Sequence, residues 1–180
     1  VRVAGGVPVL VETTMDTGFD PAPEQIKKAI SPRTKAIIVN SPSNPTGAML
    51  SRRTLETVIG CVKGTEILVV TDDIYDRLVY KGRFENVLDL DPSLQPQVAL
   101  VNGASKTYSM TGWRIGWTAG PQALISAMQK LQDNSTSNAA SISQKAALGA
   151  LTLPGVDEEV EKMRKTFDER RKHIVQRLNA

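Results

Sequence analysis

Residues 102 to 117 read Asn-Gly-Ala-Ser-Lys-Thr-Tyr-Ser-Met-Thr-Gly-Trp-Arg-Ile-Gly-Trp and follow directly on an apolar run, Val98 to Val101, that is typical of a buried strand. Lys106 therefore comes just after a strand, among small and hydroxyl residues. Desolvation of a lysine in such a place favours its neutral amine, which can attack carbonyl groups. The alternative is a solvated loop lysine, because charged side chains are mostly exposed.

The composition is that of an ordinary globular protein. The chain has 180 residues, of which 41% are hydrophobic and 23% charged, enough for one domain with a sizeable core. The net charge is only +3, basic residues are interleaved with acids, and aromatic residues make up 4%. The sequence therefore has neither the basic stripe nor the stacking aromatics of a nucleic-acid-binding protein.

Cysteine usage and hydropathy indicate the compartment. The single cysteine, Cys61, cannot form an internal disulfide, which fits a reducing environment. No apolar run has the length of a membrane span, and the first residues lack the pattern of a signal peptide. We therefore expect a cytoplasmic protein without a membrane partner. The chain has no initiator Met and stops within a charged helical pattern, so we also expect a fragment of a longer protein.

Apolar runs and helical periodicity alternate along the chain. Strands are predicted for 7–12, 36–39, 67–70, 98–101 and 115–119, and helices for 21–30, 51–62, 121–132, a segment ending near 153, and 156–178. The strands at 36–39 and 67–70 are continuously apolar, as in parallel strands covered on both faces. No helix fits between the last two strands, so the last is not expected to run parallel to its predecessor. We predict a layered α/β/α fold with a mostly parallel sheet.

Three polar residues follow three different predicted strands. They are Asn44, Asp72 and Lys106. Ligands of open parallel sheets bind beyond the carboxyl ends of the strands, so these side chains are expected to converge on one ligand. The only histidine, His173, lies in the charged C-terminal helical pattern, and neither a metal site nor a Ser-His-Asp triad is predicted.

Four short motifs occur in an order that is similar to one enzyme family. They are Asn-Pro-Thr-Gly at 44–47, Asp-Asp-Ile-Tyr at 72–75, Ser-Lys at 105–106 and Gly-Trp-Arg-Ile-Gly at 112–116. Each is weak alone, but all four in this order are specific. Together they resemble the pyridoxal-phosphate-dependent aminotransferases of fold type I, class I/II, and most of all bacterial aspartate aminotransferases. The resemblance covers nearly the whole chain and implies a large domain of that type.

The resemblance implies how the cofactor ring is held. Lys106 would be the catalytic residue, which holds pyridoxal 5′-phosphate as a Schiff base and shuttles the substrate proton. Asp72 would pair with the pyridine nitrogen and keep it protonated. Tyr75 and Asn44 would donate hydrogen bonds to the phenolic oxygen.

The phosphate site follows from the same resemblance. Ser105 would supply a hydroxyl, and Arg114 a planar guanidinium that can grip phosphate with two hydrogen bonds. Arg114 lies between tryptophans and glycines, where an unpaired charge is unfavourable, so it needs an anion. Gly112 and Gly116 are expected to let the backbone pass close to its neighbours.

Several of these residues also have a purely structural alternative. Asp72 can cap a following helix, Asn44 can be only a turn residue, and Tyr75 can be a core aromatic. Asp73 aligns with a family position that is usually acidic but does not pair with the pyridine, so it is left out of the site.

Three features of the family have no counterpart in this sequence. They are a glycine-rich phosphate loop, an aromatic that stacks on the cofactor ring, and an arginine for the substrate α-carboxylate. We therefore expect residues 1–153 to form part of an incomplete cofactor-binding large domain. Residues 154–180 are expected to form a connecting helix toward a small domain.

The resemblance implies transamination between an amino acid and a 2-oxo acid, of the aspartate/2-oxoglutarate type, in a homodimeric parent. The fragment itself is expected to be catalytically incomplete. Three alternatives stay open: another reaction of the same fold, such as that of a β-lyase or a decarboxylase, a non-catalytic cofactor-binding regulatory domain, and a cofactor-free folding unit. The side-chain preference for the substrate is not set by this sequence.

Overall fold

The computed structural model describes all 180 residues, which form two compact units. The first unit consists of Val1–Asp72 and Glu85–Leu100, and the second of Asp73–Phe84 and Val101–Ala180. The strands follow the order β1-β2-β3-β4. Strand β3, Val98–Gly103, contributes its first half to one unit and its second half to the other.

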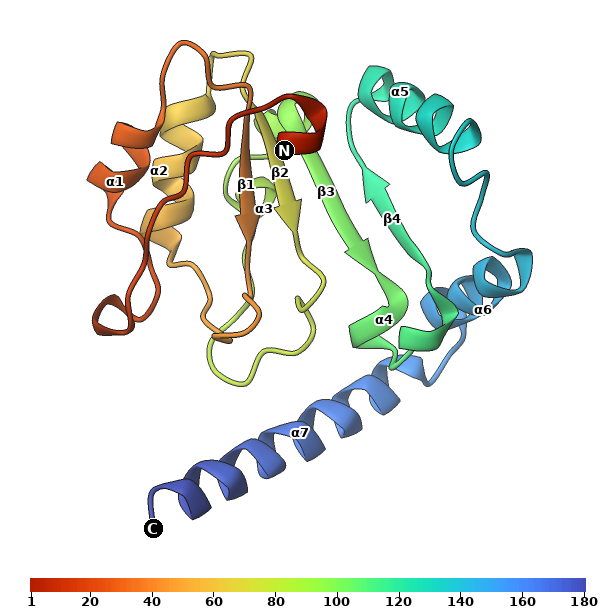
Figure 1. The fold of residues 1–180 in the computed structure, drawn as a ribbon. Coiled ribbons are helices and arrows are strands. Elements are labelled where there is room, and N and C mark those ends of the chain that lie inside the picture. The colour runs from red at the N-terminus through yellow and green to blue at the C-terminus, as the bar shows by residue number, and fades with distance from the viewer. The chain divides into compact units, whose positions relative to one another are not determined.

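The first unit is built on parallel strands with helices packed against one face (Figure 1). Strands β1 (Ala36–Asn40) and β2 (Leu68–Asp72) pair in parallel, with Ala36 opposite Leu68 and Asn40 opposite Asp72. The other face of β1 is open, because Ile38 is 62% exposed, so the expected cover on both faces is wrong for this strand. The helices are α1 (Pro23–Ala29), α2 (Arg52–Val62) and α3 (Val87–Leu90), with 3-10 turns at Arg2–Ala4, Met15–Thr17 and Pro92–Gln97. Because β1 and β2 are parallel and in register, their carboxyl ends lie at the same edge of the sheet.

Helix α2 supplies much of the core of the first unit. Its start is fixed by Ser51, whose hydroxyl accepts a hydrogen bond from the backbone N–H of Thr54. Its apolar residues recur at three- and four-residue spacing and are buried: Leu55, Val58, Ile59 and Val62. They pack with the strand residues Val39, Val69 and Val98.

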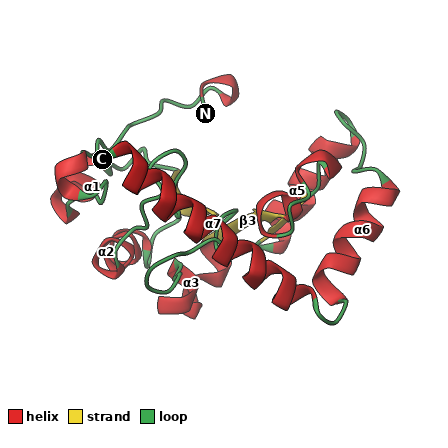
Figure 2. Cartoon of the chain, turned by 90° about the horizontal axis from the view of Figure 1, so that it is seen from below, coloured by secondary structure: helices red, strands yellow, loops and turns green.

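The second unit combines the end of β3 with β4 and four helices. Strand β4 (Gly116–Ala119) runs antiparallel to β3 (Figure 1), and the Ala104 N–H donates to the Ile115 carbonyl at 3.2 Å. The helices, drawn from another side in Figure 2, are α4 (Ala104–Thr107), α5 (Gln122–Asp133), α6 (Ser141–Thr152) and α7 (Val156–Leu178), with a 3-10 turn at Thr111–Trp113. Its core is small and centres on Ala104, Met110 and Ala147.

Helix α7 carries three contacts to segment 77–80 of the same unit, spaced by seven residues. Asp157 accepts a hydrogen bond from Arg77 at 2.8 Å, and this bond raises the pKa of the Arg77 guanidinium. Arg164 donates to the carbonyl of Val79 at 3.3 Å, and the Arg171 guanidinium lies 5.3 Å from the centre of the Tyr80 ring. Positions seven apart share one helix face, so this face of α7 is the docked one.

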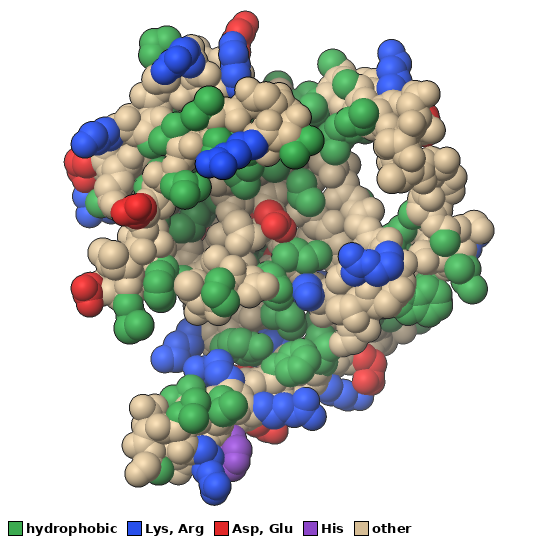
Figure 3. Space-filling model, in the orientation of Figure 1, with side chains coloured by type: hydrophobic (Ala, Val, Ile, Leu, Met, Phe, Trp, Pro, Cys, Tyr) green, Lys and Arg blue, Asp and Glu red, His purple; other side chains and the backbone are tan.

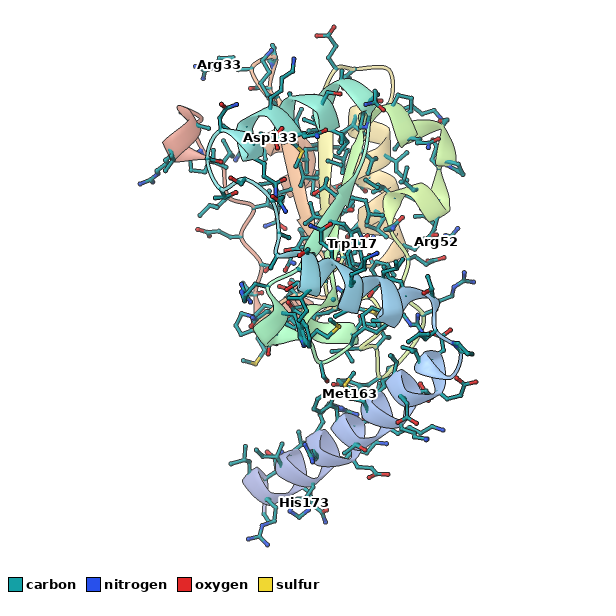
Figure 4. The ribbon with its side chains drawn as sticks, turned by 90° about the vertical axis from the view of Figure 1, so that its right-hand side faces the viewer. Arg33, Arg52, Trp117, Asp133, Met163 and His173 are labelled. Atoms are coloured by element: carbon teal, nitrogen blue, oxygen red, sulfur yellow. The ribbon has the colours of Figure 1, made fainter.

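The apolar stripe of α7 is only partly covered. Val160 is buried, whereas Ile174 and Leu178 near the end of the helix are exposed. Met163 and His173 on this helix are labelled in Figure 4, and His173, purple in Figure 3, is exposed. No helix of the chain has both the length and the apolar character that a membrane crossing requires.

The predicted mostly parallel α/β fold is confirmed, including the reversed direction of the last strand. The helices predicted for 51–62 and 156–178 agree with α2, counted from its cap, and with α7. The strand predicted for 7–12 is wrong, because this apolar run pairs with no neighbouring strand and most of its residues are exposed.

Burial of Leu55 gives a test of the core of the first unit. The Leu55 side chain is 2% exposed in α2, whereas Leu131, in α5, is 72% exposed. We expect Leu55→Ala to lower the free energy of unfolding by about 2–5 kcal/mol, because it removes packed methyl groups and leaves a cavity. The matched change Leu131→Ala should alter it by less than about 0.5 kcal/mol. Urea unfolding measures both, and equal losses would show that the assigned core is wrong.

Candidate functional site

The amine of Lys106 lies at the carboxyl end of β3. Helix α4 begins immediately after the strand, with Gly103 as its N-cap residue, and carries Lys106 as its third residue. The side chain is half-buried, and Nζ lies 5.6 Å from the centre of the Tyr75 ring. Lys106 forms no hydrogen bond or ion pair through its amine, so the ring face is its only described electrostatic contact. The structure thus brings two predicted site residues, Lys106 and Tyr75, together within the second unit.

Two glycines allow β3 and β4 to approach closely beside this lysine. A Cβ on Gly103 would lie 3.1 Å from the Ile115 carbonyl oxygen and 3.2 Å from Gly116 Cα. A Cβ on Gly116 would lie 3.0 Å from the Asn102 carbonyl oxygen. The close approach expected at Gly116 is therefore present, but the same expectation for Gly112 is wrong, since nothing lies within 4 Å of a Cβ there.

Arg114 and Ser105 have donor groups that the protein leaves largely free. Arg114 adopts a left-handed backbone, φ 51°, at the end of the 3-10 turn, and donates only to the Thr111 carbonyl, at 3.0 Å. It is exposed and in no ion pair, so the expectation that an unpaired charge is unfavourable at this position is wrong. The Ser105 hydroxyl makes no hydrogen bond within the chain. A left-handed conformation is unfavourable for a residue with a side chain, and such residues concentrate at functional sites.

Asp72 and Asn44 belong to the first unit. Asp72 is the last residue of β2, and its backbone carbonyl accepts from the Asn40 side chain at 3.4 Å. Its carboxylate forms no hydrogen bond or ion pair. A turn and not a helix follows β2, so the alternative role of Asp72 as a helix cap is excluded. Asn44 is exposed in the turn after β1, which the Gly47 N–H closes on the Ser43 carbonyl at 2.7 Å.

Asp76 is a residue near the site that the motif analysis missed. Its carboxylate accepts hydrogen bonds from Asn102 Nδ2 at 3.0 Å and from Thr107 Oγ1 at 3.4 Å. These partners are 26 and 31 residues away in the sequence, and no local pattern marks the pairing. Its place directly after the Asp-Asp-Ile-Tyr motif is the one signal that the sequence offered.

Residues 1–180 match the family model for aminotransferase class I and II. The chain belongs to this family. The aspartate aminotransferase of Geobacillus stearothermophilus is 46% identical over 179 residues, a match that covers 99% of this chain and 45% of that protein. The aspartate/prephenate aminotransferase of Nitrosomonas europaea is 42% identical over 183 residues, covering 100% of this chain and 45% of the relative.

A solved aminotransferase structure has the same fold. The aspartate aminotransferase of Thermus thermophilus with maleate superposes with a TM-score of 0.93 at 40% identity, over 99% of this chain and 46% of that one. The chain thus spans less than half the length of the aminotransferases that it matches.

The side chains present fit the cofactor of class I and II aminotransferases, pyridoxal phosphate. The aldehyde of the cofactor needs an amine that is not in an ion pair with a carboxylate, and Lys106 forms no ion pair. A pyridine nitrogen requires a carboxylate without a cation, which Asp72 supplies, and a phosphate requires donors such as Ser105 and Arg114.

The contact between β3 and β4 can be tested with two alanine substitutions. We expect Gly116→Ala to lower the free energy of unfolding by about 1–3 kcal/mol, because the new methyl group would meet the Asn102 carbonyl and force the strands apart. Gly112→Ala is the control, with an expected change below about 1 kcal/mol. Thermal unfolding of both variants makes the comparison. A loss of similar size in both would contradict the assigned contact.

Proposed function

We propose that this chain is part of a pyridoxal-phosphate-dependent aminotransferase that transfers amino groups between an amino acid and a 2-oxo acid. The single observation that carries the proposal is the environment of Lys106, a half-buried amine without an anion at the end of β3. Membership of the class I and II aminotransferases supports it. When bound, the cofactor supplies an electron sink for the substrate carbanion.

The chain's own residues then divide the work on the ring. Lys106 would hold the cofactor covalently. Once the substrate amine has displaced it, the freed Nζ would accept the proton of the substrate α-carbon and pass it to the cofactor. Asp72 keeps a proton on the pyridine nitrogen, because a carboxylate stabilises a neighbouring cation. The Tyr75 hydroxyl and the Asn44 amide donate to the phenolic oxygen. The Lys106 amine also lies over the Tyr75 ring, so both side chains can reach the same part of the cofactor.

Ser105 and Arg114 bind the phosphate in this proposal. Ser105 precedes the lysine in α4, which places a hydroxyl beside the covalent attachment point. Arg114 supplies a guanidinium that donates only one hydrogen bond within the chain, and the backbone of this residue is in the left-handed region. Charge-assisted bonds to phosphate are stronger than those between neutral groups, so these residues anchor the cofactor.

The proposed substrates are aspartate and 2-oxoglutarate. The names of the Geobacillus and Thermus relatives, and the dicarboxylate maleate named with the Thermus protein, support an acidic substrate. We further propose that the whole protein is a cytoplasmic homodimer that binds neither nucleic acid nor membrane. In it, residues 1–153 belong to the cofactor-binding large domain and residues 154–180 connect to a small domain.

Covalent trapping tests the proposal. We expect pyridoxal phosphate followed by borohydride to label Lys106 in preference to every other lysine, because in this proposal Ser105 and Arg114 hold the phosphate and keep the aldehyde beside the Lys106 amine. Mass spectrometry of the digested chain locates the label. Lys106→Ala should abolish the labelled peptide, whereas the control Lys81→Ala, at an exposed position of the second unit, should leave it unchanged. Weak labelling spread over many lysines would overturn the assignment.

A further inference from the structure

We propose that Asp76 is a positioning residue that fixes the backbone on both sides of Lys106. The inference rests on the proposed function, since it concerns how the amine is presented to the cofactor. Asp76, its two partners and Lys106 all belong to the second unit.

One carboxylate spans the segment that carries the lysine. Oδ2 of Asp76 accepts from Asn102 Nδ2 at 3.0 Å, and Oδ1 lies 3.4 Å from the Thr107 hydroxyl that donates to it. Asn102 lies in β3, four residues before Lys106, and Thr107 is the residue after it in α4. The carboxylate therefore ties the end of the strand to the helix.

Asn102 is itself held in one orientation. Its Oδ1 accepts from the Gly103 N–H at 2.7 Å, so its Nδ2 is the group left to face Asp76. Its backbone carbonyl faces the position where Gly116 has no side chain. Asn102 thus connects Asp76 to the close contact between β3 and β4.

The turn that carries Asp76 is also attached to β3 through the backbone. The Asp73 N–H donates to the Val101 carbonyl at 2.9 Å, and the Asp76 N–H donates to the Asp73 carbonyl at 3.0 Å. Tyr75, the neighbour of Asp76, places its ring 5.6 Å from Lys106 Nζ. In this turn, Tyr75 therefore contacts the Lys106 amine, and Asp76 holds the backbone that carries Lys106.

A carboxylate suits this role better than an amide. Both partners donate, and a carboxylate accepts on two oxygens, whereas an amide would turn its NH₂ group toward one of the donors. Asp76 forms no ion pair. The adjacent Arg77 directs its guanidinium to Asp157, and the Asp76 charge adds only a smaller contribution to the raised pKa of Arg77. The carboxylate accepts from two neutral donors, and the 3.0 Å bond from Asn102 is the stronger of the two, because the bond from Thr107 is 3.4 Å long.

Reductive methylation of the chain without cofactor tests the proposal. Formaldehyde and cyanoborohydride modify each lysine at a rate that depends on its exposure, and mass spectrometry reports Lys106 relative to the exposed Lys28 and Lys130. We expect Asp76→Asn to raise the relative rate at Lys106 by at least about threefold, because loss of the clamp frees a half-buried amine. An unchanged ratio would overturn the proposal.

The control is Asp91→Asn in the first unit. Asp91 also accepts two side-chain hydrogen bonds, from Lys63 and Ser93, but its partners are far from Lys106 in the sequence. It should leave the Lys106 ratio unchanged, and an equal rise in both variants would mean a general loosening. If Asp76→Asn does not fold, Thr107→Val, which keeps the shape of a buried side chain, carries the test with the same criterion.

Covalent trapping with pyridoxal phosphate separates the two proposals. Absence of a Lys106 adduct in the chain without substitutions would contradict the proposed function, whatever the methylation rates of Lys106 are. An adduct on Lys106 together with a methylation ratio that Asp76→Asn does not change would contradict the positioning role alone.

Discussion

The backbone contact between Gly103 and Gly116 is the constraint on which the site depends. A side chain at either position would meet backbone atoms of the facing strand at 3.0–3.2 Å. The absence of both side chains lets β4 lie against the end of β3, where the Ile115 carbonyl accepts from the N–H of Ala104, the first residue of α4. The helix that carries Lys106 therefore starts at a position set by backbone atoms, which is more rigid than one set by long side chains.

Charged side chains are paired along much of α7 but not at Lys106 and Arg114. Along α7, arginines and lysines pair with acids three or four residues away, at largely exposed positions where such pairs add little stability. Lys106 and Arg114 of the second unit form no ion pair within the chain. Exposed lysines such as Lys28 and Lys130 form none either, but Lys106 is half-buried. Charged groups left without a partner at the end of a strand are suited to a ligand that carries complementary groups.

Much of the fold could be predicted from the sequence because its signals are local. Continuous apolar runs marked β1 and β2, and Ser51 marked the start of α2. The strand predicted for the apolar run 7–12 was wrong, because a strand needs a neighbouring strand to pair with and local hydrophobicity does not show whether one is present. The six site residues came from short motifs, but Gly112 and Gly116 stand in the same motif and differ only in what faces them. Asp76 was missed for the same reason, since its partners lie far along the chain.

The most direct test of the account is a crystal structure of the chain after treatment with pyridoxal phosphate and borohydride. We predict continuous electron density from Lys106 Nζ to the cofactor ring, with the phosphate at Ser105 and Arg114 and the pyridine nitrogen facing Asp72. Density on another lysine, or a ring bound at Lys106 with its phosphate directed away from Ser105 and Arg114, would contradict the assigned site.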